Sequence, residues 1–254
     1  MQALILAAGT GSRLKPYTLT VPKCMVPVDG VPMIERAIDA LVAAGIKKLG
    51  IGLGYKSEVL KEFVASTFDK KRLNGMTIEF IENPVYDKTN NIYSLYLARD
   101  FFAQDDTILL ESDLVYDPKV IKDLVASQEE NLAVVSPFES WMDGTVTVLD
   151  KLDNILDFIG KKNQNPADVD KYFKTVNIYH FSKDFINHYY LPFLKTYMNV
   201  YGRNEYYETS LKILALFSPT LLKGFKISPD VWYEVDNPDD LKVASERFKA
   251  LDNK

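Results

Sequence analysis

Short apolar runs alternate with amphipathic segments along the first half of the chain. Runs bounded by glycine, proline or acidic residues are typical of buried strands, and apolar positions spaced three and four residues apart are typical of helices. The runs predict strands at residues 4–8, 49–53, 77–81, 107–110 and 133–136. The helical spacing predicts helices at residues 32–44, 58–68, 90–102 and 118–127. This alternation predicts an α/β fold with a doubly wound, mostly parallel sheet of the Rossmann-like kind.

The pattern changes after about residue 138. Two strands, at residues 144–149 and 154–159, are expected to pair in antiparallel fashion. They are followed by a strand at 175–181, helices at 189–201 and 205–217, short strands at 226–228 and 232–235, and a closing helix at 238–251. Because no shift in composition separates the halves, we expect one domain over residues 1–254. Its second part, residues 138–254, then forms a smaller lid-like subregion on the first part, residues 1–137.

Composition narrows the classes of function. Charged residues make up 26% of the chain and the formal net charge is −5, which argues against a nucleic-acid-binding surface. The single cysteine, Cys24, excludes an internal disulfide and fits a reducing compartment, where we expect it to be a packing residue. No run approaches the ~20 apolar residues that span a membrane, and the first residues lack the features of a signal peptide. We therefore expect a cytoplasmic protein without membrane insertion.

A glycine-bearing loop, residues 9–13 (GTGSR), follows the first strand. Its two glycines let backbone N–H groups approach a phosphate, Arg13 offers a fork of donors, and Lys23 can reach the same phosphates. Leu14 stands where a dinucleotide fingerprint needs its third glycine, and the G-K-[ST] of a Walker A loop is absent. The loop is thus predicted to bind phosphate in another way.

Two aspartates end strands that lie far apart in the sequence. Asp113 and Asp236 are placed where a ligand cleft opens in an α/β sheet, and hard carboxylate oxygens suit Mg²⁺. Glu111 and Glu234 lie on the same strand faces and are weaker candidates for the outer part of this site. The two histidines, His180 and His188, fall in helix or strand patterns and are expected to be structural or surface residues, so no general base is evident.

The opening segment resembles a known family. Residues 6–18 (LAAGTGSRLKPYT) and 22–28 (PKCMVPV) are similar to the opening motif of the nucleotidyltransferases that join a nucleoside triphosphate to a sugar phosphate or a small phospho-alcohol. The resemblance implies an α/β nucleotide-binding fold, dependence on Mg²⁺ and release of pyrophosphate. It also implies that the anionic acceptor attacks the α-phosphorus in line, without a general base.

The resemblance assigns roles to residues of this sequence. The implied catalytic residues are Arg13, Lys23, Asp113 and Asp236, and the last two are the implied Mg²⁺ ligands. The expected nucleotide-binding residues are Leu6, Ala8, Gly9, Thr10, Gly11, Ser12, Asn83, Asn90 and Ser94. Residues 83–95, with the pattern N-x-x-Y-x-x-x-N-N-I-Y-S-L, resemble the cytidylyltransferase branch and therefore favour CTP.

The acceptor is predicted from the second part of the sequence, residues 138–254. Residues 141–146, 174–179 and 204–208 resemble the enzymes that activate 2-aminoethylphosphonate more than the phosphocholine enzymes. A primary ammonium needs hydrogen-bond acceptors, a role that suits Asp143 and Glu208, whereas a quaternary ammonium needs an aromatic cage. The aromatic candidates are Trp141, Tyr190, Tyr206 and Tyr207, and the candidates for the acceptor's phosphorus group are Lys161, Lys162 and Lys174.

These observations predict a Mg²⁺-dependent cytidylyltransferase that uses CTP and a small zwitterionic phosphonate or phosphate, with 2-aminoethylphosphonate as the first choice. Phosphocholine is the alternative acceptor within this class. A regulatory nucleotide-binding module without catalysis is the alternative of another class, and the intact set of four catalytic residues argues against it. Relatives of the phosphonate type are often fused to another enzyme of the same pathway, so a larger fusion is left open.

Overall fold

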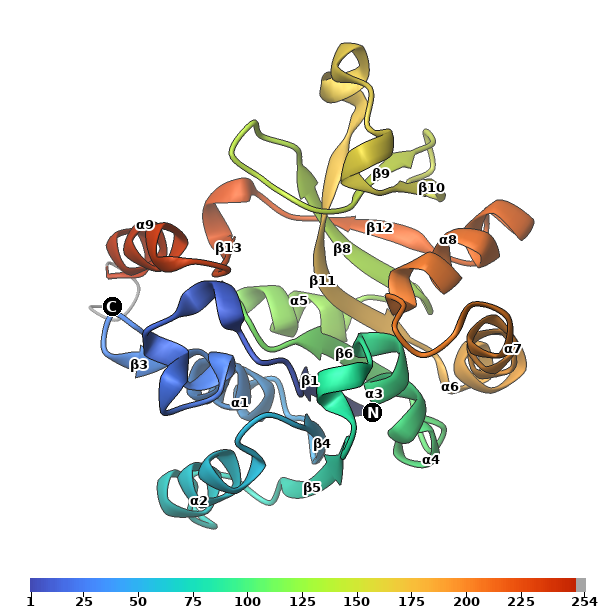
Figure 1. Cartoon of the computed structure of the whole chain (residues 1–254). Coiled ribbons are helices and arrows are strands. Elements are labelled where there is room, and N and C mark those ends of the chain that lie inside the picture. The colour runs from blue at the N-terminus through green and yellow to red at the C-terminus, as the bar shows by residue number, and fades with distance from the viewer. Residues whose placement is uncertain (250–254) are drawn as a thin grey trace.

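The centre of the molecule is a parallel arrangement of four strands. In the computed structural model, which describes residues 1–249, the order is β6 (Thr107–Glu111), β1 (Gln2–Ala7), β4 (Lys48–Leu53) and β5 (Thr77–Glu82), all parallel. The strands β1 and β6 are nearly continuous apolar runs because both faces of the sheet are covered here. The predicted doubly wound, mostly parallel core is confirmed (Figure 1).

The sheet continues beyond β6 through antiparallel neighbours. The strand β11 (Phe173–Phe181) pairs with β6, and then with β8 (Leu132–Pro137) and β9 (Val146–Leu149), all antiparallel. Within the described chain, β10 (Ile155–Ile159) pairs with β9, and β12 (Lys223–Lys226) runs parallel to β8. The long strand β11 therefore joins the parallel half to the upper subregion seen in Figure 1.

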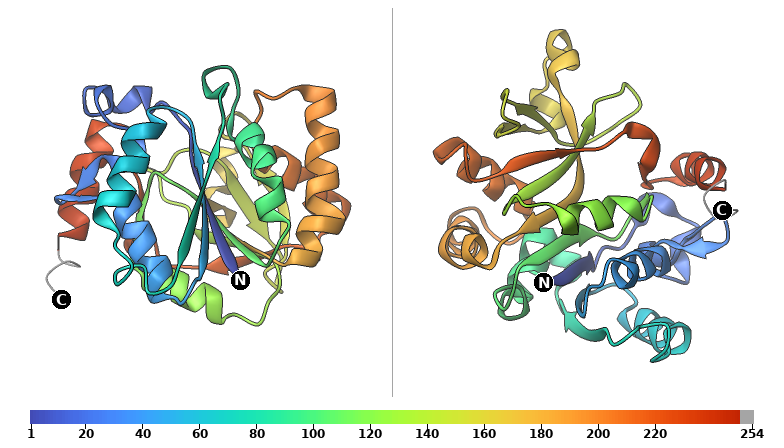
Figure 2. Two further views of the ribbon diagram at one scale, coloured as in Figure 1. Left: turned by 90° about the horizontal axis from the view of Figure 1, so that it is seen from below. Right: turned by 180° about the vertical axis from the view of Figure 1, so that it is seen from behind.

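Alternate side chains of β1 enter different cores, which is the signature of a sheet covered on both faces. Ala3 and Ile5 belong to one cluster with α1 (Met33–Ala43), α2 (Ser57–Thr67) and α5 (Lys119–Ala126). Figure 2 shows these helices on one face of the sheet.

The opposite face is covered by helices from the middle and the later chain. Leu4 and Leu6 belong to the cluster that includes α3 (Asn91–Leu97), α4 (Arg99–Phe102), α7 (Leu191–Tyr201) and α8 (Tyr207–Phe217). Helix α7 thus packs beside α3, although the two helices are about a hundred positions apart in the sequence.

A third cluster brings the end of the described chain back to its beginning. The helix α9 (Pro238–Phe248) packs against the hairpin β2 (Pro27–Val28) and β3 (Val31–Pro32). The strand β13 (Trp232–Glu234) pairs with β7 (Leu114–Tyr116), which directly follows the turn after β6. This pairing places the segment around Asp236 beside the segment around Asp113.

The structure corrects some predicted boundaries. The helix predicted at residues 90–102 is divided into α3 and α4, and the helix predicted at 205–217 begins at Tyr207. The strand predicted at 226–228 was wrong, since β12 covers Lys223–Lys226, where its backbone pairs with β8. Residues 250 and 251 of the closing helix lie outside the described part.

Two further pairings, β7 with β13 and β2 with β3, were not predicted because these strands are only two or three residues long. No helix among residues 1–249 combines the length and the apolar character that a membrane crossing requires.

Candidate active site

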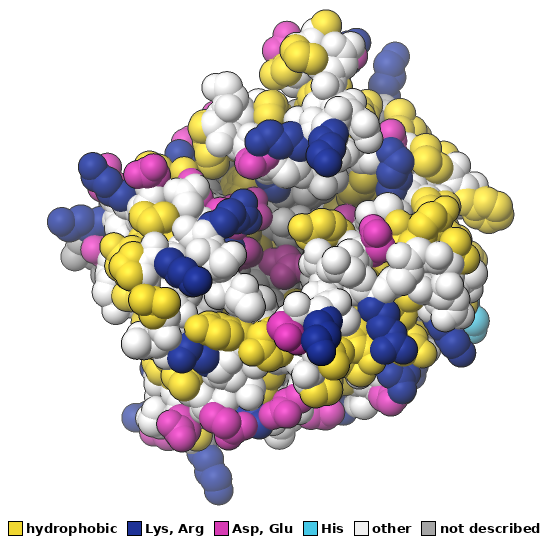
Figure 3. Space-filling view, viewed as in Figure 1, with side chains coloured by type: hydrophobic (Ala, Val, Ile, Leu, Met, Phe, Trp, Pro, Cys, Tyr) yellow, Lys and Arg dark blue, Asp and Glu magenta, His cyan; other side chains and the backbone are white. Residues whose placement is uncertain are grey.

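Two adjoining cavities open at the carboxyl ends of β1 and β6. The larger has a volume of about 390 Å³ and the smaller about 310 Å³. Arg13, Glu234 and Asp236 line both cavities, so the two spaces meet at these side chains. Figure 3 shows the hollow in the middle of this face, with acidic side chains inside it and basic side chains around it.

The loop after β1 has a conformation that requires glycine at one position. Gly11 has a φ of 59°, and a Cβ there would lie 2.8 Å from the Cβ of Lys23. The Thr18 hydroxyl donates to the Gly11 carbonyl at 2.9 Å and fixes the turn. A Cβ on Gly9 would meet no protein atom within 4 Å, so the small size of Gly9 leaves open space for a ligand.

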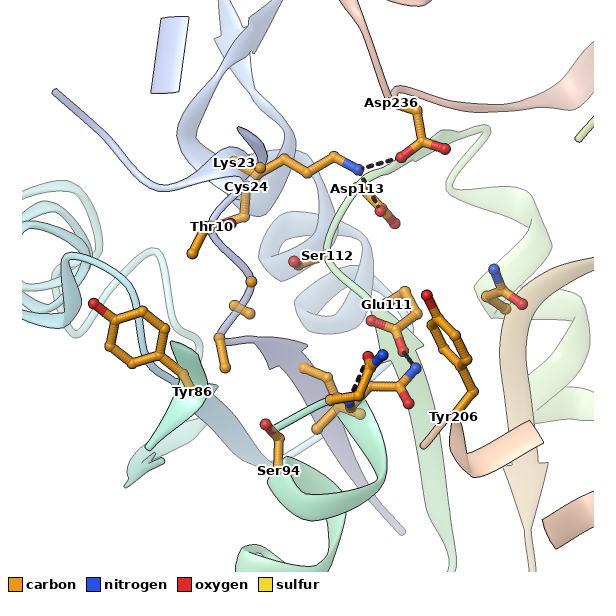
Figure 4. Close-up of a pocket in the computed structure, with 18 of the residues that line it drawn as sticks. Thr10, Lys23, Cys24, Tyr86, Ser94, Glu111, Ser112, Asp113, Tyr206 and Asp236 are labelled. Carbon is orange, nitrogen blue, oxygen red and sulfur yellow. Dashed lines mark hydrogen bonds and ion pairs between the residues drawn. The ribbon is translucent and has the colours of Figure 1, made fainter. Parts of the chain in front are cut away.

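The four predicted catalytic side chains meet in one cluster of ion pairs. Lys23 Nζ lies 2.7 Å from Asp113 Oδ2 and 2.6 Å from Asp236 Oδ1 (Figure 4). Arg13 Nη2 lies 2.7 Å from the same oxygen of Asp236. Burial lowers the pKa of Lys23, but the charges of Asp113 and Asp236 outweigh this effect and raise the pKa above its ordinary value. Lys23 therefore stays an ammonium.

The acidic side chains of this cluster fit a divalent cation. Asp113, Glu234 and Asp236 offer carboxylate oxygens that all lie within 4.8 Å of one another. Asp113 Oδ1 is buried and has no hydrogen-bond partner in the described part of the chain. Hard oxygen ligands at this spacing are those that Mg²⁺ takes in phosphate-handling sites. Glu234, a weaker candidate from the sequence, thus joins the two aspartates.

The predicted nucleotide-binding residues divide into a lining set and one residue behind it. The lining set of the larger cavity contains Leu6, Ala8, Gly9, Thr10, Gly11, Ser12, Asn90 and Ser94. Asn83 is buried, and its amide donates to Thr89 Oγ1 at 3.0 Å and to Ser94 Oγ at 3.1 Å. Its amide oxygen also accepts from the Val85 N–H. This geometry gives Asn83 a supporting position behind the cavity wall, and a direct contact with the nucleotide stays a prediction.

Two of the predicted acceptor-binding residues pair with each other at the smaller cavity. Asp143 Oδ1 lies 2.8 Å from Lys161 Nζ, and both side chains are more than half exposed. The hydrogen bond from Lys161 lowers the pKa of Asp143 below its ordinary value. Lys174 lines the same cavity but is buried, and it contacts Glu234. Lys161 is therefore exposed to solvent, whereas Lys174 is buried beside Glu234.

Glu208 lines the larger cavity together with Glu111. The Asn91 amide lies between them and donates from Nδ2 to Glu111 Oε1 at 3.1 Å and to Glu208 Oε2 at 3.5 Å. Glu111 is labelled in Figure 4. Burial raises the pKa of Glu208 to about 7 and raises the pKa of Glu111 well above its ordinary value. Neither carboxylate forms an ion pair with another residue of the described chain. The two side chains therefore present oxygen atoms to the cavity without an ion-pair partner among residues 1–249.

Several lining residues were given no role from the sequence, although Tyr86 and Asn177 lie in segments that carry the family resemblance. Asn177 lies inside a strand, yet it has a φ of 60° at an irregular register of β11, and it lines the larger cavity. Tyr86, Thr89 and Ser112 also line it. The motif marks the segments, but the folded chain is needed to show which of their side chains face the cavity.

The four aromatic residues considered for a cage do not surround one space. Tyr190 and Tyr207 are fully buried in the core. Trp141 is stacked on Tyr233 with ring centroids 4.7 Å apart and lines the smaller cavity, whereas Tyr206 lines the larger one. This distribution does not form the aromatic box that a quaternary ammonium requires.

Comparisons with known proteins fit this geometry. Residues 2–243 match the family described as nucleotidyl transferase. The chain is 30% identical over 249 residues to a CMP-5'-(3-aminopropyl)phosphonate synthase of Streptomyces rubellomurinus, a match that covers 98% of this chain and 39% of that protein. It is 39% identical over 113 residues to a 2-aminoethylphosphonate cytidylyltransferase of Lancefieldella rimae, which covers 44% of this chain and 43% of that protein. The match thus spans about two fifths of the length of each of these curated relatives.

A solved structure shows the same fold. The CTP:phosphocholine cytidylyltransferase from Streptococcus pneumoniae superposes with a TM-score of 0.76 over 96% of this chain and 97% of that chain, at 22% identity. The family match covers nearly the whole chain, and the loop, the basic residues and the carboxylates stand together at the strand ends. The chain therefore belongs to the nucleotidyl transferase family.

Proposed function

We propose that this protein transfers a cytidylyl group from CTP to 2-aminoethylphosphonate, giving CMP-2-aminoethylphosphonate and pyrophosphate. The observation that carries the proposal is the cluster of Arg13, Lys23, Asp113 and Asp236 at the junction of the two cavities. In this arrangement the larger cavity takes the nucleotide and the ammonium end of the acceptor, and the phosphonate end of the acceptor lies at the junction with the smaller cavity. The phosphonate relatives support the choice of acceptor.

The mechanism follows from the charges at the junction. The loop over residues 9–13 binds the triphosphate through backbone N–H groups, and Arg13 and Lys23 turn toward its oxygens. An oxygen of the phosphonate, ionised near neutral pH, forms a bond to the α-phosphorus of CTP. The bond between that phosphorus and the bridging oxygen breaks, and pyrophosphate carries away the negative charge. No proton has to be removed from the acceptor, so no general base is required.

Three carboxylates, Asp113, Glu234 and Asp236, would hold Mg²⁺ at this junction. The bound ion would supply charge stabilisation for the phosphate oxygens during the displacement. The chain's own contribution is to fix the two anions side by side, since Arg13 and Lys23 offset their mutual repulsion.

The ammonium of the acceptor is assigned to Glu208 and Glu111. A primary ammonium donates three hydrogen bonds, and these two carboxylates face the cavity without a cationic partner. Asp143, the first candidate from the sequence, is already paired with Lys161 at the exposed rim. Lys161 is the candidate for the phosphonate group, because its side chain is 70% exposed beside the smaller cavity.

Phosphocholine is the second candidate acceptor, and the solved structure with the same fold motivates it. The carboxylate pair favours a head group that donates hydrogen bonds, and the scattered aromatic residues disfavour a trimethylated one. A non-catalytic regulatory module is disfavoured because its carboxylates and basic residues would have no reason to keep ion-pair contact.

A panel of substrates tests the proposal. Pyrophosphate release is measured with CTP, UTP, dTTP and GTP against 2-aminoethylphosphonate, phosphocholine and glucose 1-phosphate. We expect release with CTP and 2-aminoethylphosphonate, and little with the other pairs. Preference for phosphocholine would overturn the acceptor, and preference for UTP or dTTP would overturn the nucleotide. Release with no pair, by a folded protein that binds CTP, would favour the regulatory module.

A further inference from the structure

Lys174 is a lysine in the interior of the sheet. Its side chain is only 2% exposed, and its residue is paired on one side with Ser136 of β8 and on the other with Val146 of β9. An ammonium taken out of water is costly unless other groups pair with it. A position with strands on both sides fixes the backbone of Lys174, and the burial of its side chain limits the room in which the ammonium can move.

The Lys174 ammonium contacts groups from several segments of the chain. Nζ donates to the Thr175 carbonyl at 2.7 Å and lies 3.2 Å from Glu234 Oε2. A Cβ on Gly144 would lie 3.5 Å from Nζ, so the loop that precedes β9 also closes over the ammonium. The ring of Trp232 faces it, with the centroid 5.9 Å away. These neighbours confine the ammonium beside Glu234.

The charge pairs around the cation site are divided between two lysines. Lys23 contacts both Asp113 and Asp236, while Lys174 is the ion-pair partner of Glu234 among residues 1–249. Lys23 and Arg13 can turn toward a bound triphosphate, because Lys23 lies at the cavity and the side chain of Arg13 is 66% exposed. The buried Lys174 has less room to turn away from Glu234 than the exposed Arg13 has to turn away from Asp236.

We infer that Lys174 is a positioning residue that holds the Glu234 carboxylate in the cluster with Asp113 and Asp236. It acts on the divalent cation through Glu234, and it is not the lysine that binds the phosphorus group of the acceptor. This inference rests on the proposed cation site, and it assigns the sequence candidates Lys161 and Lys174 to different tasks. The side chain of Lys161 is exposed at the edge of the smaller cavity, whereas the buried side chain of Lys174 contacts Glu234 inside it.

The test measures cation binding directly, by electron paramagnetic resonance of Mn²⁺ added to the protein without an acceptor. Loss of a partner behind a metal ligand typically weakens metal binding by roughly 10–100-fold, and we expect Lys174→Met to do so. Lys174→Arg keeps the charge and is expected to recover part of the affinity. Lys161→Met is the matched control on the same cavity and should leave Mn²⁺ binding unchanged.

A double variant tests whether Lys174 affects cation binding through Glu234. Glu234→Gln alone should weaken Mn²⁺ binding, and adding Lys174→Met to Glu234→Gln should change it little further. The double variant removes both charges of the buried pair and leaves no unpaired buried charge. It can therefore be measured if Lys174→Met alone does not fold. In steady-state kinetics, Lys174→Met should lower kcat, while Lys161→Met should raise the KM for the acceptor.

The outcomes separate this inference from the cation site itself. Unchanged Mn²⁺ binding in Lys174→Met together with a raised KM for the acceptor would overturn the positioning role. If Asp113→Asn abolished Mn²⁺ binding and Lys174→Met did not affect it, the cation site would stand without the help of Lys174. If the wild-type protein bound no Mn²⁺ even with CTP present, the proposed cation site and the inference would both be wrong.

Discussion

The two halves of the molecule meet at the candidate active site but are constructed differently. In the half around β1, neighbouring strands are parallel and are joined by short helices, and the glycine-bearing loop follows β1 directly. In the half around β11, strands with long sequence separations pair in antiparallel fashion, and the site residues come from several separate segments. The first half offers the glycine-bearing loop with Arg13, Lys23 and Asp113, and the second offers Glu208, Glu234 and Asp236.

This difference fits the two kinds of ligand in the proposed reaction. A triphosphate is alike in every nucleotide and can be bound by a loop of fixed conformation. An acceptor varies between enzymes and needs side chains that fit its head group. Contacts such as that of Lys23 with Asp236, which are 213 positions apart, hold the two halves together at the reacting centre.

The largest effect is expected from removing a carboxylate at the junction. Asp113→Asn and Asp236→Asn each remove a predicted Mg²⁺ ligand and a partner of Lys23, so turnover should fall by roughly 10²–10³-fold or more. Circular dichroism and thermal unfolding serve as controls for the fold. Turnover within about tenfold of wild type in both variants would show that the two halves do not share a cation at this point.

A smaller loss is expected on the nucleotide side. Lys23→Ala removes charged hydrogen bonds worth roughly 1.5–3 kcal/mol each, so kcat/KM for CTP should fall about tenfold or more. The two aspartates would also lose the ammonium that lies between them, which should weaken binding of the anionic triphosphate further. CTP binding by calorimetry and initial rates measure the effect. Unchanged CTP binding and rate would mean that the loop and Lys23 do not form the triphosphate site.

The acceptor half is tested by two carboxylates in different surroundings. Glu208→Gln should lower kcat/KM for 2-aminoethylphosphonate by about tenfold, because a charged hydrogen bond to the ammonium is lost. Any turnover of phosphocholine should change much less, since its head group donates no hydrogen bond. The same acceptor pair is then compared for Asp143→Ala.

Comparing Glu208→Gln with Asp143→Ala shows which carboxylate binds the ammonium of the acceptor. The ion pair of Asp143 with Lys161 predicts that Asp143→Ala affects both acceptors alike. A selective loss of 2-aminoethylphosphonate turnover in Asp143→Ala, with none in Glu208→Gln, would return the role to Asp143, as the sequence first suggested.

The smallest effect concerns stability against pH. The pKa of Glu208 is raised to about 7, so the folded state holds this proton more tightly than the unfolded state. The resulting stabilisation is full below the unfolded pKa of Glu and is lost as the pH rises toward 7. Between pH 5 and 8, the wild type should therefore lose a few degrees of Tm relative to Glu208→Gln. Equal Tm shifts in both proteins would show that Glu208 ionises in an ordinary environment.

The sequence alone determined much of the first half and which residues form the predicted catalytic cluster. The apolar runs are local signals, and strands joined by short helices leave few alternative topologies. The loop at residues 9–13, Lys23, Asp113 and Asp236 were found from motifs and strand ends, and the structure brings them into contact. A backbone loop and a strand end retain their geometry wherever they occur, so a local pattern is enough to find them.

The tertiary structure alone decided the partners of the remaining side chains. Nothing in the local sequence indicates that Asp143 meets Lys161, that Lys174 meets Glu234, or that Asn91 lies between Glu111 and Glu208. These neighbours depend on how β11 passes between β6, β8 and β9, and on its irregular register around Asn177. The charge state and the accessibility of a side chain depend on its partners and its burial, and both are set only when segments distant in the sequence pack together.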